Sequence, residues 1–157
     1  VEPRSYKDAF RDSRLVDAMR KEITALEDNN TWCVTDLPPQ RKALPSKWVF
    51  KIKYHFDGTI ERYKARLVIA GNYQVVGEDY NETYAPLAKM ISVRTFLAVA
   101  AARNWELHQL DVHNAFLNRE LSEEVYMKFP LAFSNGMTNK VYKLRKSLYG
   151  LRQSPRN

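Results

Sequence analysis

One of the aspartates, Asp111, occupies a position where a carboxylate could bind a divalent metal ion. It follows the apolar residues of a predicted strand and precedes a turn that exposes backbone N–H groups. Carboxylate oxygens are the ligands that Mg²⁺ prefers in proteins. An aspartate at such a place can equally cap the turn that follows it. One carboxylate does not define a metal site, so both interpretations remain open at this point.

Two cations on one predicted strand, Lys64 and Arg66, form the second candidate site. Residues two apart on a strand project from the same face, and the neighbouring predicted strand presents Lys51 and Lys53 beside them. Fixed cations on a hairpin suit a triphosphate or a nucleic-acid backbone. The alternative is an exposed edge strand whose lysines prevent pairing with another chain.

The hairpin that carries these cations is predicted from a strict alternation. Residues 47–54 and 63–69 each alternate between apolar and mostly basic positions, which is typical of half-buried strands with a basic outer face. Between them, Asp57-Gly58 is the dipeptide best suited to a tight turn, so we expect a β-hairpin. The face predicted to be buried consists of Trp48, Phe50, Ile52, Tyr54, Tyr63, Ala65, Leu67 and Ile69.

Two amphipathic helices are predicted from apolar residues at helical spacing. The first spans residues 12–30, and its apolar face is formed by Leu15, Met19, Ile23 and Leu26. The second is capped by Ser92 and presents Val93, Phe96, Leu97 and Ala100. The other predicted elements are strands at 31–37, 105–112, 125–129 and from 141, a turn or short helix at 114–121, and a helix opening at Ser154-Pro155.

The charge balance favours an anionic partner. The chain has 25 Lys and Arg against 18 Asp and Glu, a net charge of +7, and nucleic acid is the leading candidate. A solvated basic surface without a partner is the alternative. A single cysteine and three scattered histidines exclude a disulfide framework and zinc-site spacing, and no apolar run reaches the ~18 residues of a membrane helix. We therefore expect an intracellular protein without a membrane partner.

Six short segments, in this order, resemble the reverse transcriptases of copia-type LTR retrotransposons, particularly those of plants. The resemblance spans nearly the entire chain. The segments are Lys-Trp-Val-Phe-Lys at 47–51, Arg-Tyr-Lys-Ala-Arg-Leu-Val at 62–68, Asp-Tyr-Asn-Glu-Thr-Tyr-Ala-Pro at 79–86, residues 109–118, Glu-Val-Tyr-Met at 124–127, and Lys-Ser-Leu-Tyr-Gly-Leu-Arg-Gln at 146–153.

The resemblance implies a set of site residues. Asp111 corresponds to the first catalytic aspartate, which with Val112 belongs to the site of two Mg²⁺ ions. Lys64 and Arg66 fall where the fingers contact the incoming triphosphate. The turn whose amides face the phosphates is formed by Asn114 and Ala115, the residue that blocks a ribose 2′-hydroxyl is Phe116, and the glutamine lining the nucleotide pocket is Gln153.

The resemblance also implies a fold and an activity. The expected fold is α+β: a lead-in helical segment at 1–31, fingers at 32–104, and the start of a palm at 105–157. The expected parent enzyme is an RNA-directed DNA polymerase that uses an RNA or DNA template-primer and deoxynucleotide triphosphates, and functions with the remainder of a Pol polyprotein in a cytoplasmic particle or the nucleus. The Tyr-x-Asp-Asp turn that supplies the other two aspartates is expected beyond Asn157, so we expect a truncated site, inactive alone.

Two other functions compete with this interpretation. The first is a non-catalytic basic remnant that only binds nucleic acid. The second is an unrelated basic structural domain, for which all six matched segments would have to be accidental.

Overall fold

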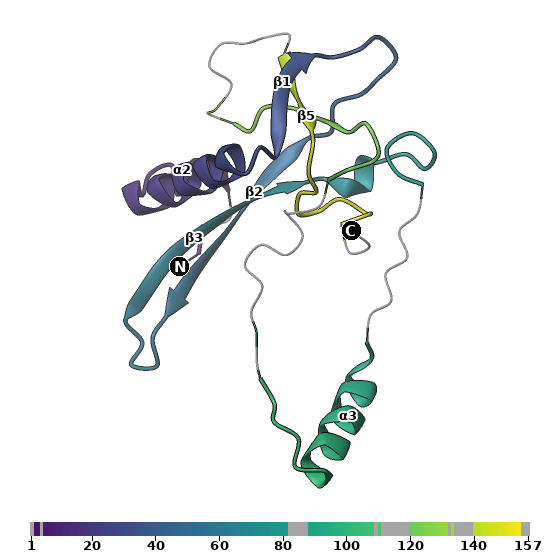
Figure 1. Ribbon diagram of the computed structural model, residues 1–157. Helices are drawn as coiled ribbons and strands as arrows, with labels where there is room; N and C mark the ends of the chain where they lie inside the picture. Colours follow the sequence, from purple (N-terminus) through teal and green to yellow (C-terminus); the bar gives the residue numbers. More distant parts are fainter. Residues whose placement is uncertain are drawn as a thin grey trace.

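The structure is a computed structural model that describes residues 2–3, 5–81, 88–108, 110, 120–131, 133 and 140–154. These residues form helices and two antiparallel sheets (Figure 1). The predicted mixed α+β class is therefore confirmed. In chain order the elements are α1 (Tyr6–Ala9), α2 (Ser13–Asp28), β1 (Trp32–Asp36), β2 (Ser46–Tyr54), β3 (Ile60–Ile69), the 3-10 turn η1 (Gly71–Tyr73), α3 (Met90–Ala102), β4 (Tyr126–Met127) and β5 (Lys140–Leu144).

Helix α2 follows the predicted amphipathic pattern. Its N-cap is Asp12, whose side chain accepts a hydrogen bond from the Arg14 backbone N–H at 3.0 Å and satisfies one of the free donors of the first turn. The helix packs mainly on β3 (Figure 1). All four residues of the predicted apolar face are buried, and burying each such side chain stabilises the fold by roughly 1.5–3 kcal/mol: Leu15, Met19, Ile23 and Leu26.

Strands β2 and β3 form the predicted hairpin. Its turn is stabilised by Asp57, whose Oδ1 accepts hydrogen bonds from the backbone N–H and the hydroxyl of Thr59 at 2.8 and 2.6 Å. Gly58 takes a φ of 83°, which only glycine adopts without steric cost. The turn residues therefore have the conformation that the sequence predicts.

The predicted alternation of buried and exposed residues is confirmed in the part of the hairpin away from its turn. The buried residues of this face are Phe50, Ile52, Ala65, Leu67 and Ile69, and Trp48 packs against them half-buried. The prediction is wrong for Tyr54, which is 51% exposed. The strand register shifts between Lys53 and Tyr54, so the regular alternation ends there.

The second sheet has the order β1-β5-β4, with antiparallel pairing throughout. Trp32 of β1 stacks on Tyr142 of β5 with ring centroids 4.5 Å apart. The predicted strand at 125–129 is shorter than expected, because the Lys128 N–H donates to the Leu44 carbonyl at 2.9 Å and leaves the ladder with β5. Segments 31–37 and from 141 are strands as predicted.

One apolar cluster joins the two sheets to α2 and to a C-terminal loop formed by residues 147–154. Its members come from parts of the chain far apart in sequence, so their burial couples these elements. The cluster comprises Ile23, Leu26, Trp32, Leu44, Leu67, Ile69, Val125, Met127, Tyr142, Leu144, Leu148 and Leu151.

Helix α3 is present, but two predictions around it are wrong. The helix begins at Met90 after the N-cap Lys89, so Ser92 lies within the first turn and does not cap it. Residues 105–108 are not a strand: the Trp105 N–H donates to the Ala100 carbonyl at 2.9 Å, and its ring lies 6.1 Å from that of Phe96. Trp105, the first residue of the predicted strand, therefore folds back onto the end of α3.

Several predicted elements lie outside the described residues. They are residues 111–112 of the strand after α3, most of the turn or short helix at 114–121, and the helix after Ser154.

Candidate functional site

The hairpin presents six cations on one face. The antiparallel register places Lys51 opposite Lys64 and Lys53 opposite Arg62, with side chains of each pair projecting to the same side. Like charges directly opposite each other destabilise a hairpin. An anion bound across this face would offset that repulsion. We call this set the basic face: Lys47, Lys51, Lys53, Arg62, Lys64 and Arg66.

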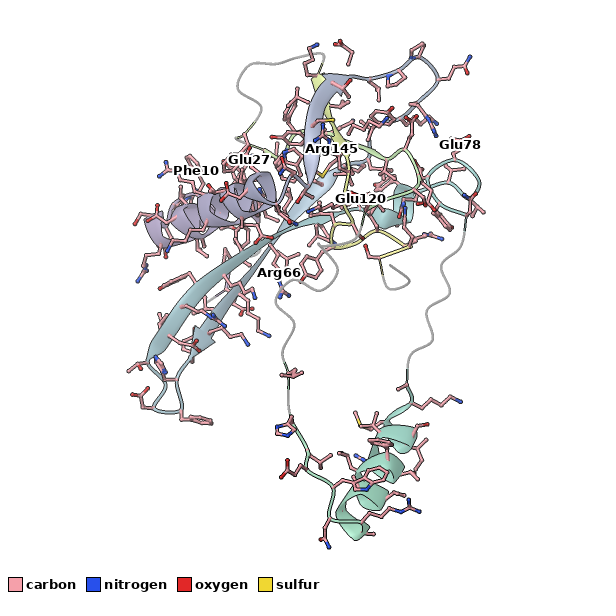
Figure 2. The ribbon with its side chains drawn as sticks, in the orientation of Figure 1. Phe10, Glu27, Arg66, Glu78, Glu120 and Arg145 are labelled. Carbon is pink, nitrogen blue, oxygen red and sulfur yellow. The ribbon has the colours of Figure 1, made fainter. Side chains whose placement is uncertain are left out.

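Arg66 is held against the C-terminal loop. Its guanidinium carbon lies 4.8 Å from the centre of the Tyr149 ring, which is a cation–π distance. The Tyr149 carbonyl accepts a hydrogen bond from the Ile69 N–H at 2.8 Å, so the loop is attached to the same strand that carries Arg66. Figure 2 shows Arg66 at the point where the hairpin meets this loop. Arg66 is half-buried, and its neighbour in the C-terminal loop is the Tyr149 ring.

Lys64 lies beside Arg66 on the basic face and is half-buried. Burial and then the positive charges of Arg66 and Arg62 lower the pKa of Lys64 from its ordinary value. The cations of the basic face thus repel each other. A phosphate group placed among them would reverse the direction of this electrostatic effect.

A carboxylate from α2 lies close to the same strand. Glu22 Oε1 accepts a hydrogen bond from the Leu67 N–H at 3.4 Å. Burial raises the pKa of Glu22, while the Leu67 N–H and the charges of Arg66 and Lys64 oppose that rise. Glu22 therefore places one negative charge near two of the cations predicted to bind phosphate.

Gln153 is buried and bonded on both sides of its amide. Its Nε2 donates to the Asp79 carbonyl at 3.0 Å, and its Oε1 accepts from Gln74 Nε2 at 3.0 Å. Its neighbour Arg152 donates to the Gly71 carbonyl at 3.1 Å and to the Tyr80 hydroxyl at 2.9 Å. This network fixes the end of the C-terminal loop. In its own two bonds the Gln153 amide uses one of its two N–H donors and one of its two acceptor positions.

The structure brings together only some of the predicted site residues. Lys64 and Arg66 share the basic face, and Gln153 belongs to the loop that contacts Arg66. Five predicted site residues lie outside the described residues: Asp111, Val112, Asn114, Ala115 and Phe116. Within the part of the chain that the structure describes, no group of three or more His, Cys, Asp or Glu could hold a metal ion.

Two residues near the site are missing from the sequence predictions, namely Tyr149 and Glu22. They lie 83 and 44 positions from Arg66, so no local spacing links them to it. The sequence signal for Tyr149 is its place in the matched segment 146–153, beside Gly150, whose φ of 95° marks a turn of fixed shape.

No helix among the described ranges is both long and apolar enough to span a bilayer.

Comparison with known proteins identifies related sequences over the whole chain. The family described as reverse transcriptase (RNA-dependent DNA polymerase) matches residues 29–157. The retrovirus-related Pol polyprotein from transposon RE1 of Arabidopsis thaliana is 46% identical over 157 residues, which is 99% of this chain and 11% of that relative. The corresponding polyprotein from transposon TNT 1-94 of Nicotiana tabacum is 44% identical over 159 residues, covering 99% of this chain and 12% of the relative.

A third relative, the retrovirus-related Pol polyprotein from transposon RE2 of Arabidopsis thaliana, is 45% identical over 157 residues, or 99% of this chain and 11% of that protein. The chain thus spans 11–12% of the length of these relatives. No solved structure gives a significant match. The chain belongs to the reverse transcriptase (RNA-dependent DNA polymerase) family and is related to the Pol polyproteins of plant copia-type transposons.

Proposed function

We propose that this chain supplies the fingers and the first part of the palm of an RNA-directed DNA polymerase. In this assignment residues 1–31 are the lead-in segment, 32–104 the fingers and 105–157 the start of the palm. The observation that supports it best is the basic face, where six cations lie on one side of a hairpin whose other side is largely buried. Such a surface suits the phosphates of a template-primer and of a deoxynucleotide triphosphate.

The proposal assigns different tasks to the two ends of the basic face. Lys64 and Arg66, which lie near the packed half of the hairpin, contact the triphosphate. Arginine forks onto phosphate oxygens and lysine acts as a point charge, so the pair can both orient and neutralise the group. Lys53 and Arg62 lie closer to the turn and contact the template-primer backbone.

The remaining assignments rest on the family resemblance. Asp111 is the catalytic aspartate and, with Val112, the part of this chain that would hold Mg²⁺. Bound Mg²⁺ would neutralise charge on the phosphates during nucleotidyl transfer. The amides of Asn114 and Ala115 face the phosphates, Phe116 excludes a ribose 2′-hydroxyl, and Gln153 lines the nucleotide pocket. The 157 residues contain no Tyr-x-Asp-Asp sequence, so we expect no primer extension by this chain alone.

The test is a salt titration of binding to a labelled template-primer duplex by the 157-residue chain. We expect affinity to fall as salt rises, because phosphate contacts release counterions. Lys53→Ala and Arg62→Ala should each weaken binding and reduce the slope of log affinity against log salt by about one. Lys7→Ala, which removes an exposed lysine of α1, is the matched control and should change neither value.

The outcomes separate the proposal from its competitors. Equal effects of all three substitutions would mean that the basic face is a solvated surface without a specific anionic partner. Salt-dependent binding that depends on Lys53 and Arg62 but not on Lys7 supports the proposal. The alternative of a non-catalytic remnant is tested in a complete polymerase that contains these 157 residues. If Asp111→Ala left primer extension unchanged in that enzyme, the catalytic assignment would be wrong.

A further inference from the structure

The contact between Arg66 and Tyr149 joins two segments that are distant in sequence. The guanidinium lies over the ring at 4.8 Å. A cation at this distance from an aromatic face is attracted by the ring's negative π surface, and arginine can stack flat on it. The contact therefore restricts the orientation of a side chain that otherwise has many rotamers.

The position of the Tyr149 ring is set by its backbone. The Tyr149 carbonyl accepts from the Ile69 N–H at 2.8 Å, three residues after Arg66 on the same strand. At Gly150 a Cβ atom would lie 2.1 Å from the Ile69 carbonyl oxygen, so the two backbones approach as closely as glycine allows. Leu148 and Leu151 are buried on either side. Tyr149 is thus fixed relative to β3 by main-chain contacts as well as by its ring.

The contact with one ring leaves Arg66 with donors for another partner. The guanidinium carbon lies over the ring, and the planar fork carries five N–H donors, more than one ring can engage. Among the described residues Arg66 makes no ion pair with a carboxylate. An arginine that is oriented and makes no such ion pair is prepared for an external anion, because little conformational freedom is lost when the anion binds.

We propose that Tyr149 is a positioning residue for the nucleotide site: its ring holds the Arg66 guanidinium on the basic face in the orientation that receives a phosphate group. This inference rests on the proposed function, in which Arg66 contacts the triphosphate. It adds a residue of the C-terminal loop to that site. It also makes the affinity of the site depend on the contact between the loop and β3.

The experiment measures binding of inorganic tripolyphosphate to the 157-residue chain by titration calorimetry. Tyr149→Leu removes the ring and keeps an apolar side chain, whereas Tyr149→Phe keeps the ring. We expect Tyr149→Leu to weaken binding about three-fold to five-fold, because the anion must then order the Arg66 side chain that the ring no longer orients. Tyr149→Phe should bind as tightly as the wild type. In the Arg66→Ala background, Tyr149→Leu should cause no further loss, because the ring acts only through Arg66.

Each result has a distinct meaning. If Tyr149→Leu weakened binding equally with and without Arg66, the ring would act independently and the inference would be overturned. Loss of binding in Tyr149→Phe would overturn it too, because the hydroxyl would then be the important group. If Arg66→Ala left tripolyphosphate binding unchanged, the proposed function itself would fail at this residue.

A second measurement covers the case in which Tyr149→Leu does not fold. The ring should shift the NMR signals of the Arg66 δ-protons upfield in the wild-type chain, and Tyr149→Phe should retain this ring-current shift. Unshifted δ-proton signals in the folded wild type would overturn the proposed contact directly.

Discussion

The two halves of the β2–β3 hairpin both carry cations but differ in what supports them. Near its base, Ala65, Leu67 and Ile69 are buried against α2 and the C-terminal loop. Near its tip, Tyr54 and Phe56 are exposed, the latter completely. An isolated two-stranded hairpin is marginally stable in water. The base therefore supplies the stability of the hairpin, while the tip extends its cations into solvent.

This difference bears on recognition. At the base, the Arg66 guanidinium lies over the Tyr149 ring and Lys64 is half-buried, so the side chains of these two cations have fewer available orientations. At the tip, Arg62 lies on an exposed part of the strand. A restricted cation suits a small anion that must be oriented, such as a triphosphate. An exposed cation suits a nucleic-acid backbone, which offers a phosphate at many positions.

The largest effect should come from two glycines. Gly150 belongs to the C-terminal loop that contacts the base of the hairpin, and Gly58 belongs to the turn at its tip. Gly150 and Gly58 both have positive φ, at 95° and 83°. A Cβ on Gly150 would lie 2.1 Å from the Ile69 oxygen, whereas a Cβ on Gly58 meets nothing within 4 Å. We expect Gly150→Ala to lower the free energy of unfolding by more than about 4 kcal/mol, and Gly58→Ala by about 1 kcal/mol. Urea denaturation measures both; equal losses would show that the loop does not anchor the base.

The next comparison removes an apolar side chain from each half. Leu67 is fully buried in the core cluster, whereas Phe56 is fully exposed at the tip. Leu67→Ala should lower the free energy of unfolding by about 3 kcal/mol, because it loses burial and leaves a cavity. Phe56→Ala should stay within about 0.5 kcal/mol of the wild type. A loss of more than that in Phe56→Ala would mean that the tip is packed, contrary to the structure.

The sequence predicts the parts of this fold that depend on periodicity. The face of α2 and the alternation of the hairpin are each determined by side chains that meet one neighbouring surface, so spacing alone identifies them. The prediction for Tyr54 is wrong because a register shift interrupts the period. The strand predicted from Trp105 is wrong because a contact with Phe96 competes with extension.

The candidate site is predictable only in part, because spacing along the chain identifies residues that share a strand face but not the neighbours that other elements bring to them. Lys64 and Arg66 are two apart on one strand, and that spacing places them on one face. Their neighbours Glu22 and Tyr149 arrive through the packing of α2 and of the C-terminal loop. Such contacts depend on tertiary structure, and one sequence carries no periodic signal for them.

The smallest effect concerns charge at the base. Glu22 lies partly buried beside β3, and burial raises its pKa above the ordinary value of 4.5 despite the Leu67 N–H and the cations Arg66 and Lys64. A raised pKa in the folded state means that Glu22 favours folding most when protonated, and that this contribution is lost as pH rises through the folded-state pKa. Glu22→Gln keeps an oxygen that can accept from Leu67 and removes the charge.

The variant Glu22→Gln should therefore gain stability relative to the wild type as pH rises from about 4 to about 8. The gain should be at most about 0.5 kcal/mol, because solvent partly screens this carboxylate. Glu61→Gln, an exposed site on the tip half of β3, is the matched control and should show no such trend. Urea denaturation at several pH values gives the difference between each variant and the wild type, which cancels the titration of all other groups. If Glu22→Gln instead lost stability as pH rose, the attraction of Glu22 to Arg66 and Lys64 would outweigh its burial, and the cations at the base would be neutralised within the protein before any phosphate binds.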